Sequence, residues 1–319
     1  MEHFTIGIDI GGTKTAYGVY DSERRLVTKR RRPSDNSMSP QEFFDVIAEN
    51  VAELMTECNI TSETLRGVGI GMPSYIRYED GYILKTTNLT NIEDFAAKEY
   101  LQGRLGRDVR IILDNDGHTG ALAEHRHGAG RGFDNMLYCP VSTGISSGII
   151  IEGKLFRGRY GWAGESGHMI VTPDDGVMCG CGNSGCLMSW CSGSMIVKHV
   201  QKWIANGETT IMTEMAEGAE NITAVHIDKA WQTGDEMAIR ALEQMAKYMA
   251  IWIYNLYVTL NINCYVFGGG LLRMGDKLFG RVREIFDMYN QDDKHPVYFR
   301  NAELSEDFGI VGATELLFQ

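Results

Sequence analysis

One histidine and three cysteines lie close together in the middle of this chain. Residues 164–168 read GESGH, and residues 179–186 read CGCGNSGC. Zn²⁺ prefers four tetrahedral nitrogen and sulfur ligands, and the adjacent glycines let a short loop fold back without Cβ clashes. We therefore predict a closed structural zinc site with the ligands His168, Cys179, Cys181 and Cys186. The alternative is a set of ordinary reduced thiols, since cysteines are often small buried hydrophobes.

Length and charge narrow the class of protein. A chain of 319 residues is long enough to bury a full core and favours two lobes with a cleft. There are 30 Lys and Arg against 42 Asp and Glu, a net charge of −12, which argues against a nucleic-acid partner. We expect the basic run 29–32 to be a solvated edge strand.

Targeting signals are not evident in the sequence. It has no apolar run long enough to span a bilayer, so we expect no membrane insertion. Residues 1–5 lack the basic and apolar regions of a signal peptide, which predicts a cytoplasmic protein. In that compartment the seven cysteines would stay reduced and free to bind metal.

Three glycine turns follow apolar strands. The strands are expected at 4–10, 136–141 and 264–267, and each leads into glycines. Only glycine tolerates both the torsions and the close approach that let backbone N–H groups reach a polyphosphate. One such turn is a weak signal, because Gly-Gly pairs occur at many tight turns; three are much stronger. The turns are Gly11-Gly12, Thr143-Gly144 and Gly268 to Gly270.

Hydrophobic periodicity predicts the remaining elements. Residues 15–20 alternate as the hairpin partner of the first strand, and 148–151 pair in the same way after the second turn. This is a weak internal repeat. Further strands are expected at 68–71 and 109–113, and helices from Pro40 to about Cys58 and over 119–126, 235–257 and 308–318.

The predicted zinc ligands in residues 164–168 and 179–186, together with the N-terminal run DIGGTK, residues 9–14, resemble the ROK family pattern. This family groups bacterial sugar kinases with related repressors, and the resemblance covers nearly the whole chain. It implies an α/β, two-lobed actin-like ATPase (ribonuclease H-like) fold with the active site in the interlobe cleft. Residues 1–116 would form the small lobe, joined by a C-terminal helix over 306–319. Residues 117–305 would form the large lobe, with the zinc loop and the surface of a homodimer.

The resemblance implies ATP with Mg²⁺ as cofactor. Asp9 would lie near Mg²⁺ through water. The terminal phosphates would be cradled by Gly11, Gly12, Thr13 and Lys14, and met from the other lobe by Thr143 and Gly144. Gly269 and Gly270 would border the adenosine. The family usually has a glycine-rich run after the Thr-Gly pair, whereas this chain has Ile145, Ser146, Ser147 and Gly148.

Asp116 is the candidate catalytic base. It follows Asn115 directly after a strand, and phosphoryl transfer to a sugar needs a base beside the attacking hydroxyl. The alternative is a helix N-cap, which an Asp at a strand-to-helix junction often is. The resemblance favours catalysis, because it matches the family's Asn-Asp pair, in which Asn binds a ring hydroxyl.

Sugar hydroxyls require donors and acceptors in a fixed pattern. The expected sugar contacts are Asn88, Asn115, Asp116, Glu165 and His168. His168 would serve twice, with one ring nitrogen on zinc and the other towards the sugar. For Asn88 the competing interpretation is a turn residue before Leu89.

Two departures from the family pattern concern the sugar. The family normally has a glutamate two residues after the last zinc cysteine, and this chain has Met188. A thioether cannot accept a strong hydrogen bond, so the expected contact at the sugar's anomeric side is missing. His118 stands where many relatives have Asn.

The leading hypothesis is an ATP-dependent sugar kinase that transfers the γ-phosphoryl group to the primary (C6) hydroxyl of a hexose, glucose first. N-acetylmannosamine or N-acetylglucosamine are the alternative substrates, with allose or fructose still open. A sugar-sensing repressor is the rival from another class, although the first phosphate turn at residue 11 is expected to leave no room for a DNA-binding domain. A third hypothesis is a non-catalytic sugar-binding or regulatory member, motivated by Ser146, Ser147 and Met188.

Overall fold

The computed structural model describes residues 3–87, 89, 91–174, 176–304 and 307–319. The chain forms two compact units. Unit 1 comprises Met1–Tyr138, Gly148–Gly164 and Ala302–Gln319, and unit 2 comprises Cys139–Ser147 and Glu165–Asn301. This grouping differs from the predicted division after residue 116, because the helix that starts there packs on the C-terminal helix of unit 1.

Unit 1 is built on a mixed five-stranded sheet. The strand order is β3-β2-β1-β4-β8, with β1, β2 and β3 antiparallel and β1, β4 and β8 parallel. The strands are β1 (Phe4–Ile10), β2 (Lys14–Tyr20), β3 (Leu26–Pro33), β4 (Leu65–Met72) and β8 (Ile111–Asn115). A smaller antiparallel sheet contains β5 (Ser74–Arg77), β6 (Tyr82–Thr86) and β7 (Glu93–Phe95).

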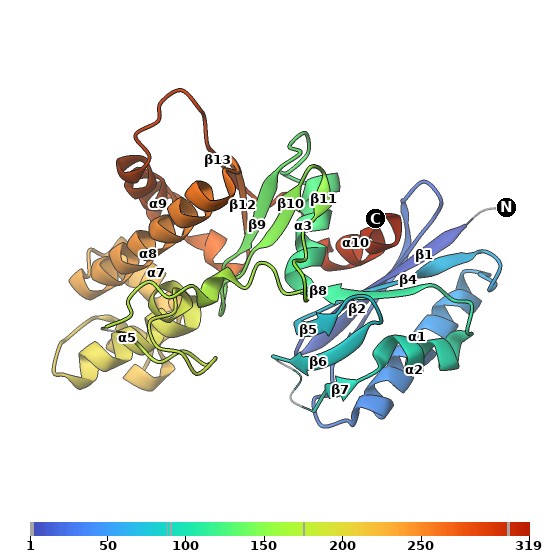
Figure 1. Cartoon of the computed structure of the whole chain (residues 1–319). Coiled ribbons are helices and arrows are strands. Elements are labelled where there is room, and N and C mark those ends of the chain that lie inside the picture. Colours follow the sequence, from blue (N-terminus) through green and yellow to red (C-terminus); the bar gives the residue numbers. More distant parts are fainter. Residues whose placement is uncertain (1–2, 88, 90, 175, 305–306) are drawn as a thin grey trace. The chain divides into compact units, whose positions relative to one another are not determined.

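The two faces of the large sheet carry different side chains. In β1 the isoleucines at 6, 8 and 10 point into the core that also holds Phe44 and Val51 of α1 (Pro40–Glu57). Alternation along the strand puts Gly7 and Asp9 on the opposite face. There α10 (Phe308–Glu315) crosses β1 and β4 (Figure 1).

A stripe of glycines lets α10 approach this face closely. Gly7 of β1 lies opposite Gly69 of β4 in the ladder. A Cβ on Gly7 would lie 2.1 Å from the carbonyl oxygen of Ile310, and one on Gly69 would lie 1.8 Å from that of Ala313. Any larger residue would push the helix away, so the glycines set how deeply α10 sits beside Asp9.

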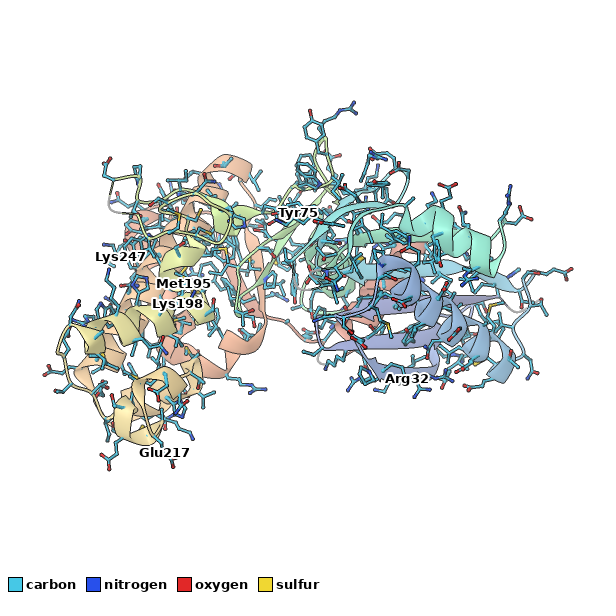
Figure 2. All side chains as sticks on the ribbon, turned by 90° about the horizontal axis from the view of Figure 1, so that it is seen from below. Arg32, Tyr75, Met195, Lys198, Glu217 and Lys247 are labelled. Atoms are coloured by element: carbon cyan, nitrogen blue, oxygen red, sulfur yellow. The ribbon has the colours of Figure 1, made fainter. Side chains whose placement is uncertain are left out.

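The other helices of unit 1 flank these layers. They are α2 (Ala97–Leu105), α3 (Asp116–His127) and the short 3₁₀ turn η4 (Leu316–Phe318) after α10. Helix α1 starts with a capping box, in which Ser39 and Glu42 satisfy each other's backbone N–H groups. The basic run is part of β3, the edge strand, as predicted. Arg30 pairs with Glu53 of α1, and Arg32 lies at the rim of unit 1 (Figure 2).

A second five-stranded sheet has the order β11-β10-β9-β12-β13. Its strands are β9 (Met136–Pro140), β10 (Gly148–Ile151), β11 (Lys154–Leu155), β12 (Cys264–Gly268) and β13 (Tyr298–Asn301). β9 carries the chain from unit 1 into unit 2. β9 and β10 pair antiparallel, as β1 and β2 do, so the weak internal repeat in the sequence corresponds to two hairpins.

Unit 2 is mainly helical. The long α8 (Glu236–Leu260) buries an apolar stripe that includes Met245, Met249 and Trp252 and packs on α9 (Asp276–Tyr289). The other helices are α4 (Met188–Cys191), α5 (Gly193–Ala205), α6 (Met212–Met215) and α7 (Ala224–Gln232), with 3₁₀ turns η1 (Ser166–His168), η2 (Ala219–Asn221) and η3 (Gly270–Met274).

The α/β class and most predicted elements are confirmed, with boundaries that differ by up to three residues. The strand expected at 109–113 begins at Ile111 and extends through Asn115, and the helix expected at 119 begins at Asp116. Periodicity could not show this, because the first helical turn is ordered by a capping side chain and not by an apolar stripe. Among the described residues, no helix has the length and apolar character needed to cross a membrane.

Candidate active site

In unit 1, Asp116 stands at the start of α3 and is not its N-cap. The cap is Asn115, whose side-chain oxygen accepts a hydrogen bond from the N–H of Gly117 at 2.7 Å. The amide nitrogen of Asn115 donates to the carbonyl oxygen of Ser74 at 3.2 Å. The Oδ1 of Asp116 also accepts from Gly117, at 2.9 Å, and within the described part of the chain Oδ2 has no hydrogen-bond partner. Asp116 therefore keeps one carboxylate oxygen available for chemistry.

Both acidic residues of this region have raised pKa values. The protein packed around Asp116 disfavours its charge and raises the pKa of that carboxyl, although the residue reaches solvent. Burial, together with the negative charge of Asp116, raises the pKa of Asp9 to about 6, against the opposing effect of Lys14. A carboxylate whose pKa approaches neutrality is a better proton acceptor than an ordinary one.

Asp9 is held against the C-terminal helix. It lies near the end of β1, and a Cβ on Gly309 of α10 would fall 2.2 Å from its carboxyl carbon. The residue at 309 must therefore be glycine for Asp9 to keep its position. The sequence signalled a returning helix but not this contact, which joins residues 300 positions apart.

The predicted phosphate turn of unit 1 is the β1–β2 hairpin. The N–H of Gly11 donates to the carbonyl oxygen of Lys14 at 2.9 Å, and the side chain of Asn36 donates to the carbonyl oxygen of Gly12 at 3.0 Å. Thr13 and Lys14 are exposed at its tip. The turn is thus braced from one side and presents a hydroxyl and an ammonium group to solvent.

A buried charged cluster lies beneath the start of α3. The carboxylate of Asp114 accepts hydrogen bonds from Nδ1 of His118 at 2.6 Å and from Nε of Arg157 at 2.7 Å. Nε2 of His118 faces the carbonyl oxygen of Ala163 at 3.0 Å. Both ring nitrogens therefore face acceptors, which requires an imidazolium. Burial opposes that charge, but Asp114 outweighs it and raises the pKa of His118.

In unit 2 the structure brings together the four predicted metal ligands. The ligand atoms of His168, Cys179, Cys181 and Cys186 all lie within 4.8 Å of one another. The separations between His168 Nδ1 and Cys179 Sγ and between the sulfurs of Cys181 and Cys186 are both 3.6 Å. Tetrahedral Zn²⁺ with ordinary bond lengths separates its ligand atoms by about 3.5 to 3.8 Å. The residues fit a zinc ion.

The histidine of this cluster has two distinct sides. Nδ1 faces Cys179, whereas Nε2 lies 3.9 Å from a carboxylate oxygen of Glu165. A metal on Nδ1 would leave the proton on Nε2, on the side of Glu165. Ser147 hydrogen-bonds to Ser166 and so ties the segment after the predicted phosphate residues Thr143 and Gly144 to the residue after Glu165.

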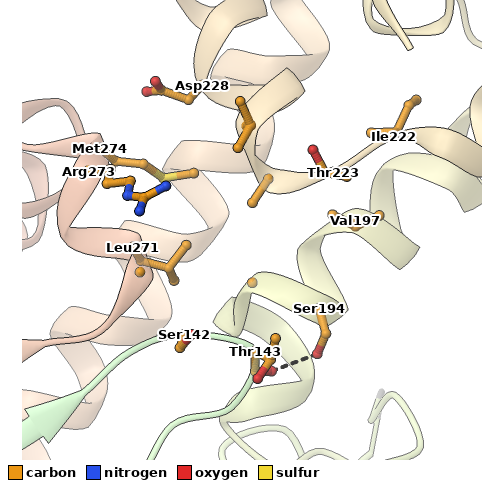
Figure 3. A pocket seen from close by; sticks show the side chains of 14 residues that line it. Ser142, Thr143, Ser194, Val197, Ile222, Thr223, Asp228, Leu271, Arg273 and Met274 are labelled. Carbon is orange, nitrogen blue, oxygen red and sulfur yellow. Dashed lines mark hydrogen bonds between the residues drawn. The ribbon is translucent and has the colours of Figure 1, made fainter. Parts of the chain in front are cut away.

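A cavity of about 520 Å³ lies within unit 2 (Figure 3). Its lining includes the apolar side chains of Val197, Ile222 and Leu271, together with Thr143 and Gly270. This size and lining are typical of a small-molecule site with few polar contacts.

Loop and helix backbones shape this cavity. Gly269 has φ 89°, and a Cβ there would lie 2.4 Å from the carbonyl oxygen of Val141, so only glycine fits. The N–H of Gly193, at the start of α5, donates to the carbonyl oxygen of Ser142, and Ser194 Oγ donates to that of Thr143 at 2.7 Å. The positive end of the α5 dipole is therefore fixed beside the predicted phosphate residues.

Sequence reasoning found only part of this cavity. Thr143 and Gly270 line it, and Gly144 and Gly269 are their immediate neighbours in the chain. The Ser192-Gly193-Ser194 run, a helix N-cap followed by small residues, is a signal that could have identified the start of α5. Nothing in the local sequence marked the segment 222–225, which also lines the cavity. The lining residues missed were Ser142, Gly193, Ser194, Val197, Ile222, Thr223, Ala224, Val225, Asp228, Leu271, Arg273 and Met274.

The last two residues singled out in the sequence are Asn88 and Met188. Asn88, a predicted sugar contact, lies outside the described residues. Met188 begins α4 and is partly buried, and its methyl carbon lies 3.6 Å from where a Cβ on Gly144 would be. Met188 therefore lies beside Gly144, one of the predicted phosphate residues.

Comparison with known proteins agrees with this description. A sequence model of the ROK family matches residues 5–319. The glucokinase of Streptomyces coelicolor is 30% identical over 317 residues, 98% of this chain and 96% of that protein. The N-acetyl-D-glucosamine kinase of Salmonella paratyphi B is 31% identical over 274 residues, 83% of each chain.

A solved structure supports the same assignment. The ROK family glucokinase from Streptomyces griseus, determined in complex with glucose and AMPPNP, is 29% identical and superposes with a TM-score of 0.78, covering 98% of each chain. The predicted two-lobed, actin-like ATPase fold is confirmed. Because the family match extends over nearly the whole length, this chain belongs to the ROK family.

Proposed function

We propose that this protein is an ATP-dependent hexose kinase with Asp116 as its catalytic base. The observation that carries the proposal is the position of Asp116 at the start of α3. Asn115 is the N-cap of this helix, so the Asp116 carboxylate is not needed as the cap. Among the described residues, its Oδ2 has no hydrogen-bond partner. The reaction class agrees with the glucokinase relatives, which match the chain almost end to end.

In the proposed reaction, the primary hydroxyl oxygen of the sugar forms a bond to the γ-phosphorus of ATP. The bond from that phosphorus to the bridging oxygen breaks, and ADP leaves with the electron pair. The hydroxyl proton passes to Asp116, whose pKa is raised by burial, which makes the carboxylate a stronger base than an ordinary one. The transfer otherwise depends on alignment and charge stabilisation.

The nucleotide is assigned to the cavity of unit 2. Its apolar walls suit a purine, and Arg273 supplies a positive charge at the cavity. Thr143, Gly144 and the start of α5 would meet the phosphate chain from one side. Gly11, Gly12, Thr13 and Lys14 are the second set of candidates for the terminal phosphates.

The metals have separate roles. Asp9 is the candidate for holding Mg²⁺ through water, and the ion would neutralise charge on the phosphates when bound. Zn²⁺ on His168, Cys179, Cys181 and Cys186 would be structural. It would set the tautomer of His168 and so orient Nε2 beside Glu165 for a sugar hydroxyl.

Glucose is the first candidate substrate, because glucokinases are among the relatives that cover almost the whole chain. The N-acetyl-D-glucosamine kinase relative keeps N-acetylhexosamines as the alternative. Met188 lacks the hydrogen-bonding capacity of a glutamate, so a panel of sugars must decide. The homodimer, the cytoplasmic location and the cleft between lobes stay predictions.

The test is sugar-dependent ADP release with Mg-ATP over a panel of glucose, mannose, allose, fructose, N-acetylglucosamine and N-acetylmannosamine. Turnover on at least one sugar, with phosphate found on the primary hydroxyl by NMR, is expected. ADP release that never depends on added sugar, from a folded and zinc-loaded protein, would reject the kinase assignment.

A further inference from the structure

Three aromatic side chains of unit 1, the exposed Tyr160 and Trp162 and the half-buried Tyr75, form a cluster that the proposed kinase reaction does not use. Tyr75 lies on β5, and Tyr160 and Trp162 lie in the loop after β11. The ring centroids of Tyr75 and Trp162 are 5.6 Å apart with planes at 87°, and those of Tyr160 and Trp162 are 5.7 Å apart. We call these three residues the aromatic shelf.

The shelf is open to solvent. Tyr160 is 70% exposed and Trp162 is 41% exposed, so neither ring is buried in the core. Scattered single apolar residues on a surface need no explanation, whereas adjacent exposed aromatic rings are a candidate binding surface. The aromatic shelf is therefore a candidate ligand-binding surface.

Two hydrogen bonds attach the shelf to the first turn of α3. Asn115 donates to the carbonyl oxygen of Ser74, the residue before Tyr75, at 3.2 Å. His118 donates to the carbonyl oxygen of Ala163, the residue after Trp162, at 3.0 Å. Asp116 lies between the two donors in sequence. Both segments of the shelf are thus anchored on the turn that carries the proposed catalytic base.

The loop that bears the shelf is also braced from within. Arg157, at its start, pairs with the buried Asp114 at 2.7 Å, and its guanidinium lies 3.8 Å from the ring centroid of Tyr78. Gly161, between the two aromatic residues, has φ 81°, and a Cβ there would lie 2.8 Å from the carbonyl oxygen of Ile76. These contacts make the shelf a preorganised surface, which reduces the entropy lost on binding.

The chemistry of the shelf suits a sugar ring. A pyranose has C–H groups on its faces and hydroxyls at its rim, so it can stack on the electron-rich face of an aromatic ring. The three aromatic rings have successive centroid separations of 5.6 and 5.7 Å. Together they span more than the width of one pyranose ring. The polar groups assigned to the phosphorylated sugar, such as Asn115, are separate from the shelf.

We propose that the aromatic shelf is a stacking subsite for a second sugar ring, so that the acceptor is a disaccharide phosphorylated on the primary hydroxyl of one ring. This rests on the proposed kinase function and names its substrate class. The second ring would stack on Trp162 and Tyr160 while the first is held at Asp116.

The experiment compares glucose with cellobiose and maltose as acceptors and measures binding of each sugar by calorimetry. The wild-type protein should have a higher kcat/KM for one disaccharide than for glucose. Trp162→Ala and Tyr160→Ala should each lower kcat/KM for that disaccharide by about tenfold, the effect expected of one lost stacking contact. Their values for glucose should stay within about twofold of wild type, and Trp162→Phe should retain most of the disaccharide activity.

The matched control is Tyr289→Ala in unit 2. Tyr289 is 39% exposed and packs on Tyr254 with a centroid separation of 5.6 Å, so it too is an exposed member of an aromatic pair. It lies on α9, away in sequence from the turn that carries Asp116, and its loss should change neither substrate.

The outcomes separate the subsite from the kinase assignment. Turnover of glucose with no turnover or binding of any disaccharide would overturn the shelf and leave the kinase standing. Equal losses for glucose and disaccharide in Trp162→Ala would also overturn it, because they would indicate a merely structural role. Disaccharide binding that Trp162→Ala abolishes, without turnover of any sugar, would support the shelf and reject the kinase.

Discussion

The two units hold their candidate functional groups by different means. In unit 1, Asp9 and Asp116 stand at a strand end and a helix start, and their positions follow from ladder hydrogen bonds, a capping side chain and the packing of α10. In unit 2, Glu165 and His168 lie in a segment with little regular structure, and four ligand atoms converge there instead. Regular structure positions the acids, whereas a metal would position the proposed sugar contacts.

This difference predicts where each unit is vulnerable. The acids of unit 1 should respond to substitutions that change charge or packing density. The contacts of unit 2 should respond to loss of the metal. Four variants test this contrast, and they follow in order of expected effect.

Asp116→Asn should have the largest effect. The amide cannot accept the hydroxyl proton, and a positioned base contributes about 10³-fold to the rate. We expect kcat to fall by about that factor while sugar affinity, measured by calorimetry, changes little. Because Asn115 caps α3, the melting temperature should not fall. Retained turnover would show that another group is the base.

Cys186→Ser should damage unit 2 selectively. The thiol is fully buried in the cluster, and its loss should release zinc and raise KM for the sugar by roughly ten- to a hundredfold. Zinc content by mass spectrometry and proteolysis within 165–190 are the measurements. Cys191→Ser is the control, since Cys191 is equally buried but lies outside the cluster. Full zinc content in Cys186→Ser would disprove the metal site.

Gly309→Ala should act on unit 1 without changing any charge. The new methyl group would fall 2.2 Å from the carboxyl carbon of Asp9 and displace it. A displacement of that kind lowers kcat by about tenfold or more. Gly280→Ala, in α9, is the control, because its Cβ would make an ordinary 3.6 Å contact with Asp276. Equal activity of the two variants would show that the position of Asp9 is not critical.

Asp9→Asn should change stability by the smallest amount and in a pH-dependent way. The folded pKa of Asp9, about 6, exceeds its ordinary value of 3.8. Between pH 3.8 and about 6 the folded state therefore binds more protons at Asp9 than the unfolded state does. Above pH 6 the carboxylate is charged in the folded protein, which lowers the free energy of unfolding. We expect Asp9→Asn to melt higher than wild type at pH 7.5, and this gain to vanish as the pH falls towards 4. Asp108→Asn, the same substitution at an exposed position, is the control. A gain that does not depend on pH would contradict the assignment.

Much of unit 1 could be predicted because its signals are local. The isoleucines of β1 alternate, the apolar residues of α1 recur at helical spacing, and an Asn-Asp pair directly follows an apolar strand. The start of α3 was placed three residues late, because the cap is a single side chain that periodicity does not register. The role of Gly309 was missed entirely, since its partner Asp9 lies at the other end of the chain.

In unit 2 the four candidate zinc ligands could be recognised from the sequence, whereas the cavity could not. Ligand type and spacing identified these four residues, which the fold then brought within 4.8 Å of one another. The cavity draws its lining from four separate segments, around residues 142, 193, 223 and 272, and no local pattern links them. The aromatic shelf is similar, since Tyr75 and Trp162 meet only after β5 and the loop after β11 are in place.

Local sequence patterns were enough to identify the family, most strands and helices, the candidate metal ligands and the candidate base Asp116. These features depend on residue type and on spacings of a few positions, which short-range sterics and hydrogen bonding translate directly into structure. The folded chain was needed to show which oxygen of Asp116 is available, how α10 confines Asp9, which segments line the cavity and which aromatic rings share a surface. Those properties depend on contacts between residues far apart in the chain, whose distances no local pattern contains.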